Sequence, residues 1–526
     1  MIAAEGLVTI RYGAGAPSTA GAVEYCDLLI IDEMLPCDFS PFRNLEYTHY
    51  LSYFESSLLV TFQGWRNGYS NLNFDDQLAA SSLRNECKAK VRPFSSFPRI
   101  VPKLAYITFL TNAWQALPFL EERNIPFILQ LYPGGGFEIN GEESDRRLKQ
   151  ILHSPLCKKV IVTQNLTRDY LLNRIRCADE KIEFIYGGVY DTKNEFDFFR
   201  DKKLYGRDKR TLDICFVAHR YGDDVKKKGY DQFVAVAKAL SAQHPDVRFH
   251  VVGDYTPDQI PLEHATEKVT FHGRKPNSFF KAFYPQMDII LSANRPSNED
   301  RSGAFDGFPT GACMEAGFRG VLNCISDPLN MNIAFHDGED IVLVDFETSK
   351  TIARLGELIA DVDKLYELSY ANWRSFLKAF DTNSQLWERS RLINLALLQP
   401  EALIIRPPVR LSDLDASRIA AMRVQVAAAH ANFEDATRRH DNLLGEYLKL
   451  SAGFDELHSD HVALIDRAKK LEAAGNAGQA SGLPDQPPVI GQLDRAVLRV
   501  LHSRYVMRLR KAFARTRSVK SGTATH

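Results

Sequence analysis

The residues Asp306-Gly307-Phe308-Pro309-Thr310-Gly311-Ala312-Cys313-Met314-Glu315 place two carboxylates on either side of a turn that opens a predicted helix. Thr310 is a favourable N-cap, and the residues after it are small or compatible with a helix. The free amides of a first helical turn admit a phosphate, because the helix dipole favours negative charge there. Glu315 can accept hydrogen bonds from a ribose diol, and Asp306 can reach the hydroxyls of a second sugar. The stretch predicts a nucleotide-sugar site, although a capped core helix after a loop would give the same pattern.

A second motif lies upstream, at another predicted junction between a strand and a helix. Residues 212–218 are predicted to form a buried strand, and His219 and Arg220 follow it. The run Lys226-Lys227-Lys228 then precedes Gly229 and an apolar-periodic helix. A lysine run is most often a solvated face, but the buried strand before it and the Lys-Gly junction after it favour a site for an anion.

Short apolar runs alternate with predicted helices between these two motifs. The runs cover residues 248–252, 269–271 and 287–291, and each is followed by small or polar residues. Such an alternation indicates a parallel sheet covered by helices on both faces. Ligands of these sheets bind beyond the carboxyl ends of the strands, which is where the basic and acidic candidates lie.

The first half of the chain shows the same alternation of apolar runs and helices, which predicts a second nucleotide-binding-like domain. Its predicted strands cover residues 26–32, 57–62, 105–110, 127–131 and 159–163. The fourth of them is followed by Gly134, Gly135 and Gly136, whose backbone can approach a ligand closely because these residues lack a Cβ. Contact with an acceptor or a diphosphate is a weaker prediction for these glycines and for Arg43, because a flexible loop and an exposed structural arginine are the alternatives.

The Asp306–Glu315 stretch resembles the C-terminal domain of retaining GT-B glycosyltransferases of the family-four type. The signature of that family is a Glu, seven residues and a second Glu around a Gly-Phe turn. This chain departs from it, since the first acid is Asp306 and Glu315 follows nine positions later instead of eight. The family also carries an Arg after the matching strand and a Lys-Gly at the next helix, both directed at the donor diphosphate. Arg220 and Lys228 match them, and His219 replaces the Arg if the loop aligns one residue earlier.

The resemblance implies an α/β fold of GT-B type, with two Rossmann-like domains whose parallel sheets face a cleft. The catalytic residues that it implies are Asp306, Arg220 and Lys228. The donor-binding residues that it implies are Arg220, Lys228, Asp306, Gly307, Phe308, Gly311 and Glu315. It covers roughly residues 25–398, and before residue 210 it rests on topology alone.

The same resemblance and the composition suggest domain limits. We expect an acceptor-side domain over residues 1–190, a linker over 191–209 and a donor-binding domain over 210–360. The strand that ends in Gly187-Gly188 resembles the interdomain strand of the family, and helices over 361–400 would cross back to brace the first domain. With 526 residues and 45% hydrophobic content, the chain is long enough for two cores and a tail.

Composition and motifs also bear on compartment and cofactors. The sequence has no run of eighteen apolar residues and no signal pattern, and its eight cysteines show neither paired nor metal-like spacing. We therefore expect a cytoplasmic protein, with contact at the inner face of the membrane as a further option. Asp-x-Asp pairs occur only at Asp361/Asp363 and Asp413/Asp415, far from the donor motifs. We expect no metal and no cofactor, with Arg220, Lys228 and the helix terminus holding the charge of the diphosphate.

The C-terminal part differs in kind from the rest. Apolar residues recur at steps of three and four over residues 412–474, which predicts a coiled coil. A second copy of the chain is its most economical partner, and folding back onto the body of the protein is the alternative. Residues 475–491 are rich in Gly, Ala and Pro and predict a flexible linker.

Residues 492–526 predict a basic amphipathic tail that can lie on an anionic membrane surface. A solvated basic tail is the alternative. We expect no nucleic-acid partner, because no aromatic platform or known reading module accompanies the charge.

The sequence therefore predicts a metal-independent glycosyltransferase of hexosyltransferase type. Its donor would be a nucleoside-diphosphate sugar, its acceptor a glycan, a lipid-linked glycan or a polysaccharide, and the resemblance implies retention of configuration. A non-hydrolysing nucleotide-sugar epimerase and a catalytically inactive binding or scaffold protein are the alternatives. Product formed from donor alone would reveal the first of these, and donor affinity without transfer would reveal the second.

Overall fold

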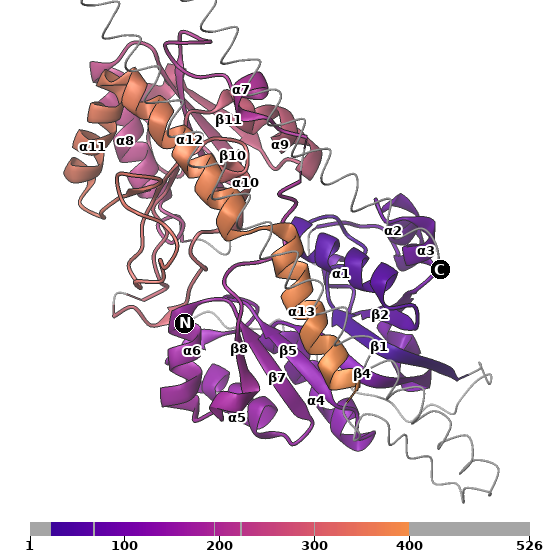
Figure 1. The fold of residues 1–526 in the computed structure, drawn as a ribbon. Helices are drawn as coiled ribbons and strands as arrows, with labels where there is room; N and C mark the ends of the chain where they lie inside the picture. The colour runs from indigo at the N-terminus through magenta and orange to yellow at the C-terminus, as the bar shows by residue number, and fades with distance from the viewer. Residues whose placement is uncertain (1–22, 67–68, 194, 221–223, 299, 399–526) are drawn as a thin grey trace, which may run out of the picture. The chain divides into compact units, whose positions relative to one another are not determined.

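The computed structural model describes residues 23–398, apart from residues 67–68, 194, 221–223 and 299. The predicted coiled coil (412–474), linker (475–491) and basic tail (492–526) lie outside the described residues. The described chain contains two α/β domains, each built on one parallel sheet (Figure 1). The predicted pair of Rossmann-like domains is confirmed.

The first sheet has seven parallel strands in the order β3-β2-β1-β4-β5-β7-β8. Their bounds are β1 (Glu24–Asp32), β2 (Ser57–Thr61), β3 (Val91–Pro93), β4 (Ile100–Thr108), β5 (Phe127–Leu131), β7 (Cys157–Val162) and β8 (Ile182–Phe184). In β1 the run Leu28–Ile31 is fully buried, because helices cover both faces of the sheet. β3 was not among the predicted strands; it ends in a proline and lies at the sheet edge, where a missing N–H is tolerated.

The second sheet has six parallel strands in the order β11-β10-β9-β12-β14-β15. Their bounds are β9 (Leu212–Ala218), β10 (Val247–Gly253), β11 (Val269–Gly273), β12 (Ile289–Ser292), β14 (Leu322–Ile325) and β15 (Val342–Leu343). The register aligns Val247 with Leu212 and Gly253 with Ala218, so β9 and β10 end together. His219 and Asp254 therefore leave the sheet side by side.

Helices connect the strands of both domains. In the first domain they are α1 (Pro41–Tyr53), α2 (Phe74–Ala80), α3 (Asn85–Lys88), α4 (Leu110–Glu122), α5 (Glu142–His153) and α6 (Asn165–Tyr170). In the second they are α7 (Phe198–Asp201), α8 (Tyr230–Gln243), α9 (Asn277–Phe283), α10 (Gly311–Gly317) and α11 (Thr348–Ala360). α8 and α11 pack together and bury Phe233 and Leu355 against Phe216 of β9.

Two consecutive helices link the second domain to the first. α12 (Val362–Ala379) packs on α10 and β14, and α13 (Thr382–Leu397) packs on α1 and β4 (Figure 1). α13 buries Leu392 and Ile393 in the core cluster that contains Leu28 and Tyr106. The end of the described chain is thus part of the core of the first domain.

A buried polar network fastens α13 to the first domain. Arg389 of α13 is fully buried, and its Nε lies 3.1 Å from Gln130 Oε1 and 3.8 Å from Glu46 Oε1. Arg389 Nη2 also donates to the Gly187 carbonyl at 3.2 Å. Glu46 is fully buried as well and accepts hydrogen bonds from the hydroxyls of Tyr50, Tyr106 and Tyr132. Burial alone would lower the pKa of Arg389, but Tyr132 and Glu46 raise it, so the guanidinium stays charged.

We predict that Arg389→Met destabilises the protein by about 3–5 kcal/mol, because it leaves a buried charge without its partner. Urea unfolding followed by tryptophan fluorescence would measure the loss. Arg391→Ala is the matched control, because Arg391 lies on the same helix and pairs with the partly exposed Glu388 at 3.2 Å. Removing that surface pair should cost under about 1 kcal/mol. Equal effects of the two substitutions would contradict a structural role for the buried network.

Candidate functional site

Lys228 and Asp306 form an ion pair beyond the carboxyl ends of the second sheet. Lys228 Nζ lies 2.6 Å from both carboxylate oxygens of Asp306, although 78 residues separate them. The side chain of Lys228 is 11% exposed and that of Asp306 is 31% exposed, so both lie at an accessible surface. The structure thus brings Lys228 and Asp306 of the two motifs into direct contact.

Local backbone geometry fixes Lys228. Gly229 has a φ of +81°, and a Cβ there would lie 2.5 Å from the carbonyl oxygen of Ala293. Only glycine allows α8 to begin this close to the end of β12. The amide of Gly229 donates to the Lys226 carbonyl at 2.8 Å, which closes the turn before the helix. The predicted Lys-Gly junction therefore has a steric cause.

Arg220 and His219 follow β9 at the same edge of the sheet. Burial raises the pKa of Tyr255, nearby Arg220 lowers it and Asp306 raises it, so both charged groups act on this one hydroxyl. His219 Nδ1 lies 2.7 Å from Asp254 Oδ2, and the His219 ring packs edge-on against Phe39 of the first domain, with ring centroids 5.5 Å apart. Burial lowers the pKa of His219, with a smaller lowering from Lys228. Either alignment of the loop puts a basic side chain near Lys228.

The turn before α10 lines a pocket of the second domain. Residues around this pocket include Ser292, Asn294, Asp306, Gly307, Thr310 and Ser326. They follow the carboxyl ends of β12 and β14, where ligands of parallel sheets bind. Thr310 is the N-cap of α10, and its hydroxyl accepts from the amide of Cys313 at 3.4 Å. The predicted cap is confirmed.

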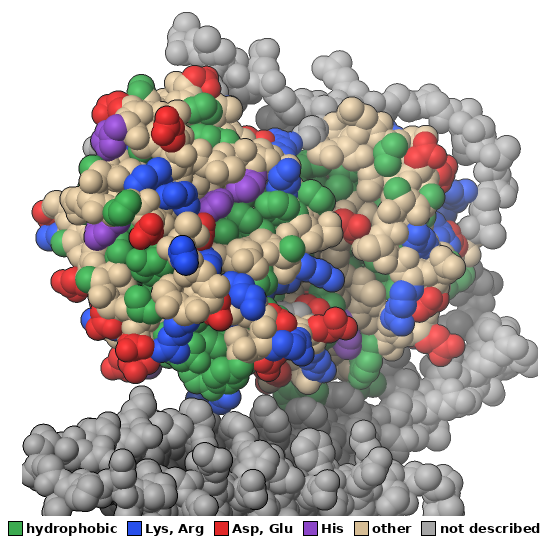
Figure 2. All heavy atoms as spheres, turned by 90° about the horizontal axis from the view of Figure 1, so that it is seen from above, with side chains coloured by type: hydrophobic (Ala, Val, Ile, Leu, Met, Phe, Trp, Pro, Cys, Tyr) green, Lys and Arg blue, Asp and Glu red, His purple; other side chains and the backbone are tan. Residues whose placement is uncertain are grey.

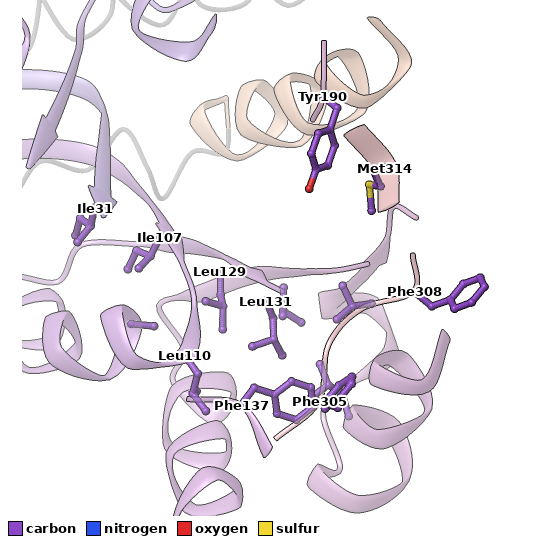
Figure 3. Packing of buried hydrophobic residues seen from close by; sticks show 14 of the residues in the cluster. Ile31, Ile107, Leu110, Leu129, Leu131, Phe137, Tyr190, Phe305, Phe308 and Met314 are labelled. Carbon is purple, nitrogen blue, oxygen red and sulfur yellow. The ribbon is translucent and has the colours of Figure 1, made fainter. Parts of the chain in front are cut away.

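Glu315 lies on α10 and is half-buried. Burial raises the pKa of its carboxyl group above the ordinary value of 4.5, and Arg319 opposes that shift. Tyr190 and Tyr284 lie close enough for the charge of Glu315 to raise their own pKa values. A Cβ on Gly311 would lie 3.0 Å from the Tyr190 hydroxyl, so this tyrosine covers the start of the helix. Figure 3 shows Tyr190 beside Met314 of α10.

The weaker candidates of the first domain have different surroundings. Arg43 is 5% exposed, and its Nη1 lies 2.9 Å from Asp32 Oδ1 and 2.6 Å from Glu33 Oε1. The structure therefore makes it a buried, paired arginine and not an exposed one. All of Gly134, Gly135 and Gly136 have positive φ values, which explains the run of glycines. The carbonyl of Gly135 accepts from Thr111 at the start of α4, and a Cβ on Gly134 would meet open space.

Sequence reasoning missed three residues around this site. Gln164, Tyr186 and Tyr190 belong to the first domain or the segment after it, yet they contact the turn before α10 or α10 itself. Gln164 follows a predicted strand, and the two tyrosines flank the predicted Gly187-Gly188 hinge. Their positions beside a predicted strand or hinge were thus the signal in the sequence that could have pointed to these residues.

Some general properties bear on the chemistry of the site. All eight cysteines are buried and unpaired. Over residues 23–398, apart from the gaps given above, there is no cluster of three His, Cys, Asp or Glu side chains suited to a metal ion. No helix in that same part of the chain is long and apolar enough to cross a bilayer. Basic and acidic side chains are interspersed on the face that Figure 2 shows.

Comparison with solved structures defines the fold. HepE of Anabaena, solved with UDP-glucose, superposes with a TM-score of 0.52 and 13% identity, over 70% of this chain and all (100%) of that chain. Sucrose-phosphate synthase from Thermosynechococcus elongatus gives 0.50 and 12% over 70% and 98% of the chains, and a glycosyltransferase from Rickettsia africae gives 0.50 and 14% over 71% and 99%. The chain has the GT-B fold. Neither a protein-family model nor a curated protein sequence matches it.

Because burial raises the pKa of Glu315, we predict that Glu315→Gln stabilises the ligand-free protein at neutral pH. The folded state holds this proton more tightly than the unfolded chain, so wild-type stability falls as the pH rises from 4.5 through the folded-state pKa. The gain from Glu315→Gln should vanish below that window, where both states are protonated. Melting temperatures across pH 4–8 would measure it, with the exposed Glu357→Gln as control. A loss of stability at neutral pH would contradict the prediction.

Proposed function

We propose that this protein is a glycosyltransferase that takes a sugar from a nucleoside-diphosphate donor. The observation that carries the proposal is the pairing of Lys228 with Asp306 at the carboxyl edge of the second sheet, where Arg220 follows the end of β9. Two cations suit a diphosphate, and a carboxylate beside them suits sugar hydroxyls. An ammonium has three donor protons, so Lys228 can serve a phosphate oxygen and Asp306 at once.

In the proposed mechanism, stabilisation of the leaving diphosphate lowers the barrier. Lys228 and Arg220 hold the negative charge that develops as the bond between the sugar and the diphosphate breaks. Asp306 accepts hydrogen bonds from the sugar, and Glu315 accepts them from the ribose. The resemblance to family-four enzymes supports retention, in which the acceptor hydroxyl attacks from the face that the diphosphate leaves. Such a step requires no protein nucleophile, and the two basic side chains take the place of a divalent metal.

The acceptor in this proposal is a glycan, a lipid-linked glycan or a polysaccharide. HepE, one of the structures with the same fold, was solved with UDP-glucose, which makes uridine nucleotides the first probes to test. Base recognition depends on backbone contacts in loops, so the panel must include other bases.

We predict that the protein binds one of UDP, GDP, ADP and dTDP selectively in calorimetric titrations. Lys228→Ala should weaken that binding by roughly tenfold or more, the scale of one hydrogen bond to a charged group. Glu315→Ala should weaken it through loss of the ribose contact. The matched control is Lys226→Ala, because Lys226 is exposed and lies in the same lysine run.

Turnover measurements are a second test of the same variants. With the selected donor, Lys228→Ala should lower turnover by roughly ten- to a thousandfold, the range for one electrostatic contact to a leaving group. Wild-type protein that binds none of the four nucleotides would overturn the proposed function. Unchanged turnover in Lys228→Ala would overturn the role of this lysine.

A further inference from the structure

The segment that carries Asp306 belongs to the second domain, but the first domain holds it on its upstream side. β13 (Gly303–Ala304) pairs antiparallel with β6 (Glu138–Ile139) of the first domain. Phe305 then packs edge-on against Phe137 with ring centroids 5.4 Å apart, and both rings are almost completely buried. Figure 3 shows these two rings in contact. Strand pairing and aromatic packing therefore fix the chain immediately before Asp306.

The first domain also holds the segment on its downstream side. The carbonyl oxygen of Phe308 accepts from Gln164 Nε2 at 3.3 Å and from the Tyr186 hydroxyl at 3.1 Å. A Cβ on Gly307 would lie 3.1 Å from Gln164 Nε2 and 3.4 Å from Pro133 Cγ. Glycine at position 307 is thus what lets the two domains approach this closely. Asp306 lies between the two attachment points.

Both donors to the Phe308 carbonyl are themselves immobilised. Gln164 is 2% exposed and lies two residues after the end of β7. The Tyr186 ring stacks on Phe380 with centroids 5.4 Å apart. The backbone carbonyl of Tyr186 accepts a hydrogen bond from Gln385 Nε2 of α13 at 2.9 Å. Their hydrogen bonds to Phe308 therefore come from fixed points, not from flexible surface side chains.

We propose that Gln164 and Tyr186 position Asp306 for the sugar of the donor, so that the first domain sets the affinity for that sugar. The inference rests on the proposed function. In that function Arg220, Lys228 and Glu315 hold the nucleoside diphosphate. Asp306 alone among these four residues accepts hydrogen bonds from the transferred sugar. Loosening the Phe308 carbonyl displaces Asp306, while Glu315 stays on the capped helix α10 and Arg220 stays at the end of β9. Lys228 also stays in place, because the turn at Gly229 packs against Ala293 and does not depend on Asp306. The affinity for the sugar should thus change separately from the affinity for the nucleotide.

The test compares a nucleotide with its sugar ester in matched variants. Tyr186→Phe and Gln164→Met remove the two donors with little change in volume. Ser57→Ala is the control, because Ser57 is 3% exposed in the first domain and its hydroxyl donates to the Phe54 carbonyl at 2.6 Å, apart from the Glu46 network and from the turn that carries Asp306. UDP and UDP-glucose are the probes, replaced by the matching pair if the nucleotide panel selects another base.

We expect the double variant Tyr186→Phe/Gln164→Met to bind UDP-glucose roughly five- to tenfold more weakly than wild type, the scale of one or two hydrogen bonds. Its affinity for UDP should stay within about twofold, because no contact to the nucleotide is lost. Ser57→Ala should leave the ratio of the two affinities unchanged. An equal weakening for both probes, or none for either, overturns the inference.

Hydrogen exchange of the ligand-free protein separates this inference from the proposed function. Backbone amides of residues 302–310 should exchange faster in the double variant than in wild type or Ser57→Ala, because a buried carbonyl loses both donors. Faster exchange supports positioning of the turn even if wild-type protein binds no nucleotide, since the amides report on the turn itself. Unchanged exchange in the double variant overturns the positioning role, whatever the nucleotide titrations give.

Discussion

The cost of burying the Arg389 guanidinium constrains the arrangement of both domains. A charge removed from water needs a charged partner and complete hydrogen bonding, and few positions in a core supply both. For Arg389, Glu46 supplies the charged partner, and Gln130 and the Gly187 carbonyl accept its hydrogen bonds. That requirement fixes α13 on the first domain. It also fixes Gly187, whose φ of +83° and lack of a Cβ let Phe380 pack directly on the backbone.

A series of direct contacts links Gly187 to the candidate site. Gly187 is adjacent to Tyr186, which stacks on Phe380 and donates to the Phe308 carbonyl. Phe308 lies two residues beyond Asp306, and the Asp306 carboxylate is bound by Lys228. The segment between the domains thus does more than connect them, because the Tyr186 side chain contacts the turn that carries Asp306. Helices α12 and α13, which are far from Asp306 in sequence, act on its position through these contacts.

Local sequence patterns were sufficient to predict two parallel-sheet domains and the junctions between strand and helix that carry Lys228 and Thr310. The buried strands give short apolar runs, and Lys228-Gly229 and Thr310 carry signals that depend on a few neighbouring residues. Gln164 and Tyr186 carry no such signal, since each meets Phe308 across 144 and 122 residues of sequence, respectively. β6 and β13 have two residues each, too few to show a period, and they pair only because the domains already lie together. Arg43 shows the converse, since the sequence around this basic residue in the first turn of α1 gives no sign of its buried pairing with Asp32 and Glu33.

The departure from the family-four signature falls in the part of the site that the first domain holds. Glu315 lies five residues after the cap Thr310, about one and a half helical turns, so the regular geometry of α10 sets its position. The stretch from Asp306 to Thr310 has no such regular geometry, and under the proposed function it accommodates the residue by which the acid spacing exceeds that of the family-four signature. An irregular turn has many conformations of similar free energy, and ordering it costs roughly 1–2 kcal/mol per residue. Here β13, the Phe305 ring and the Phe308 carbonyl offset that cost with contacts to the first domain. A longer turn with a shorter acid can thus hold its carboxylate as firmly as a regular one, provided that the two domains stay together.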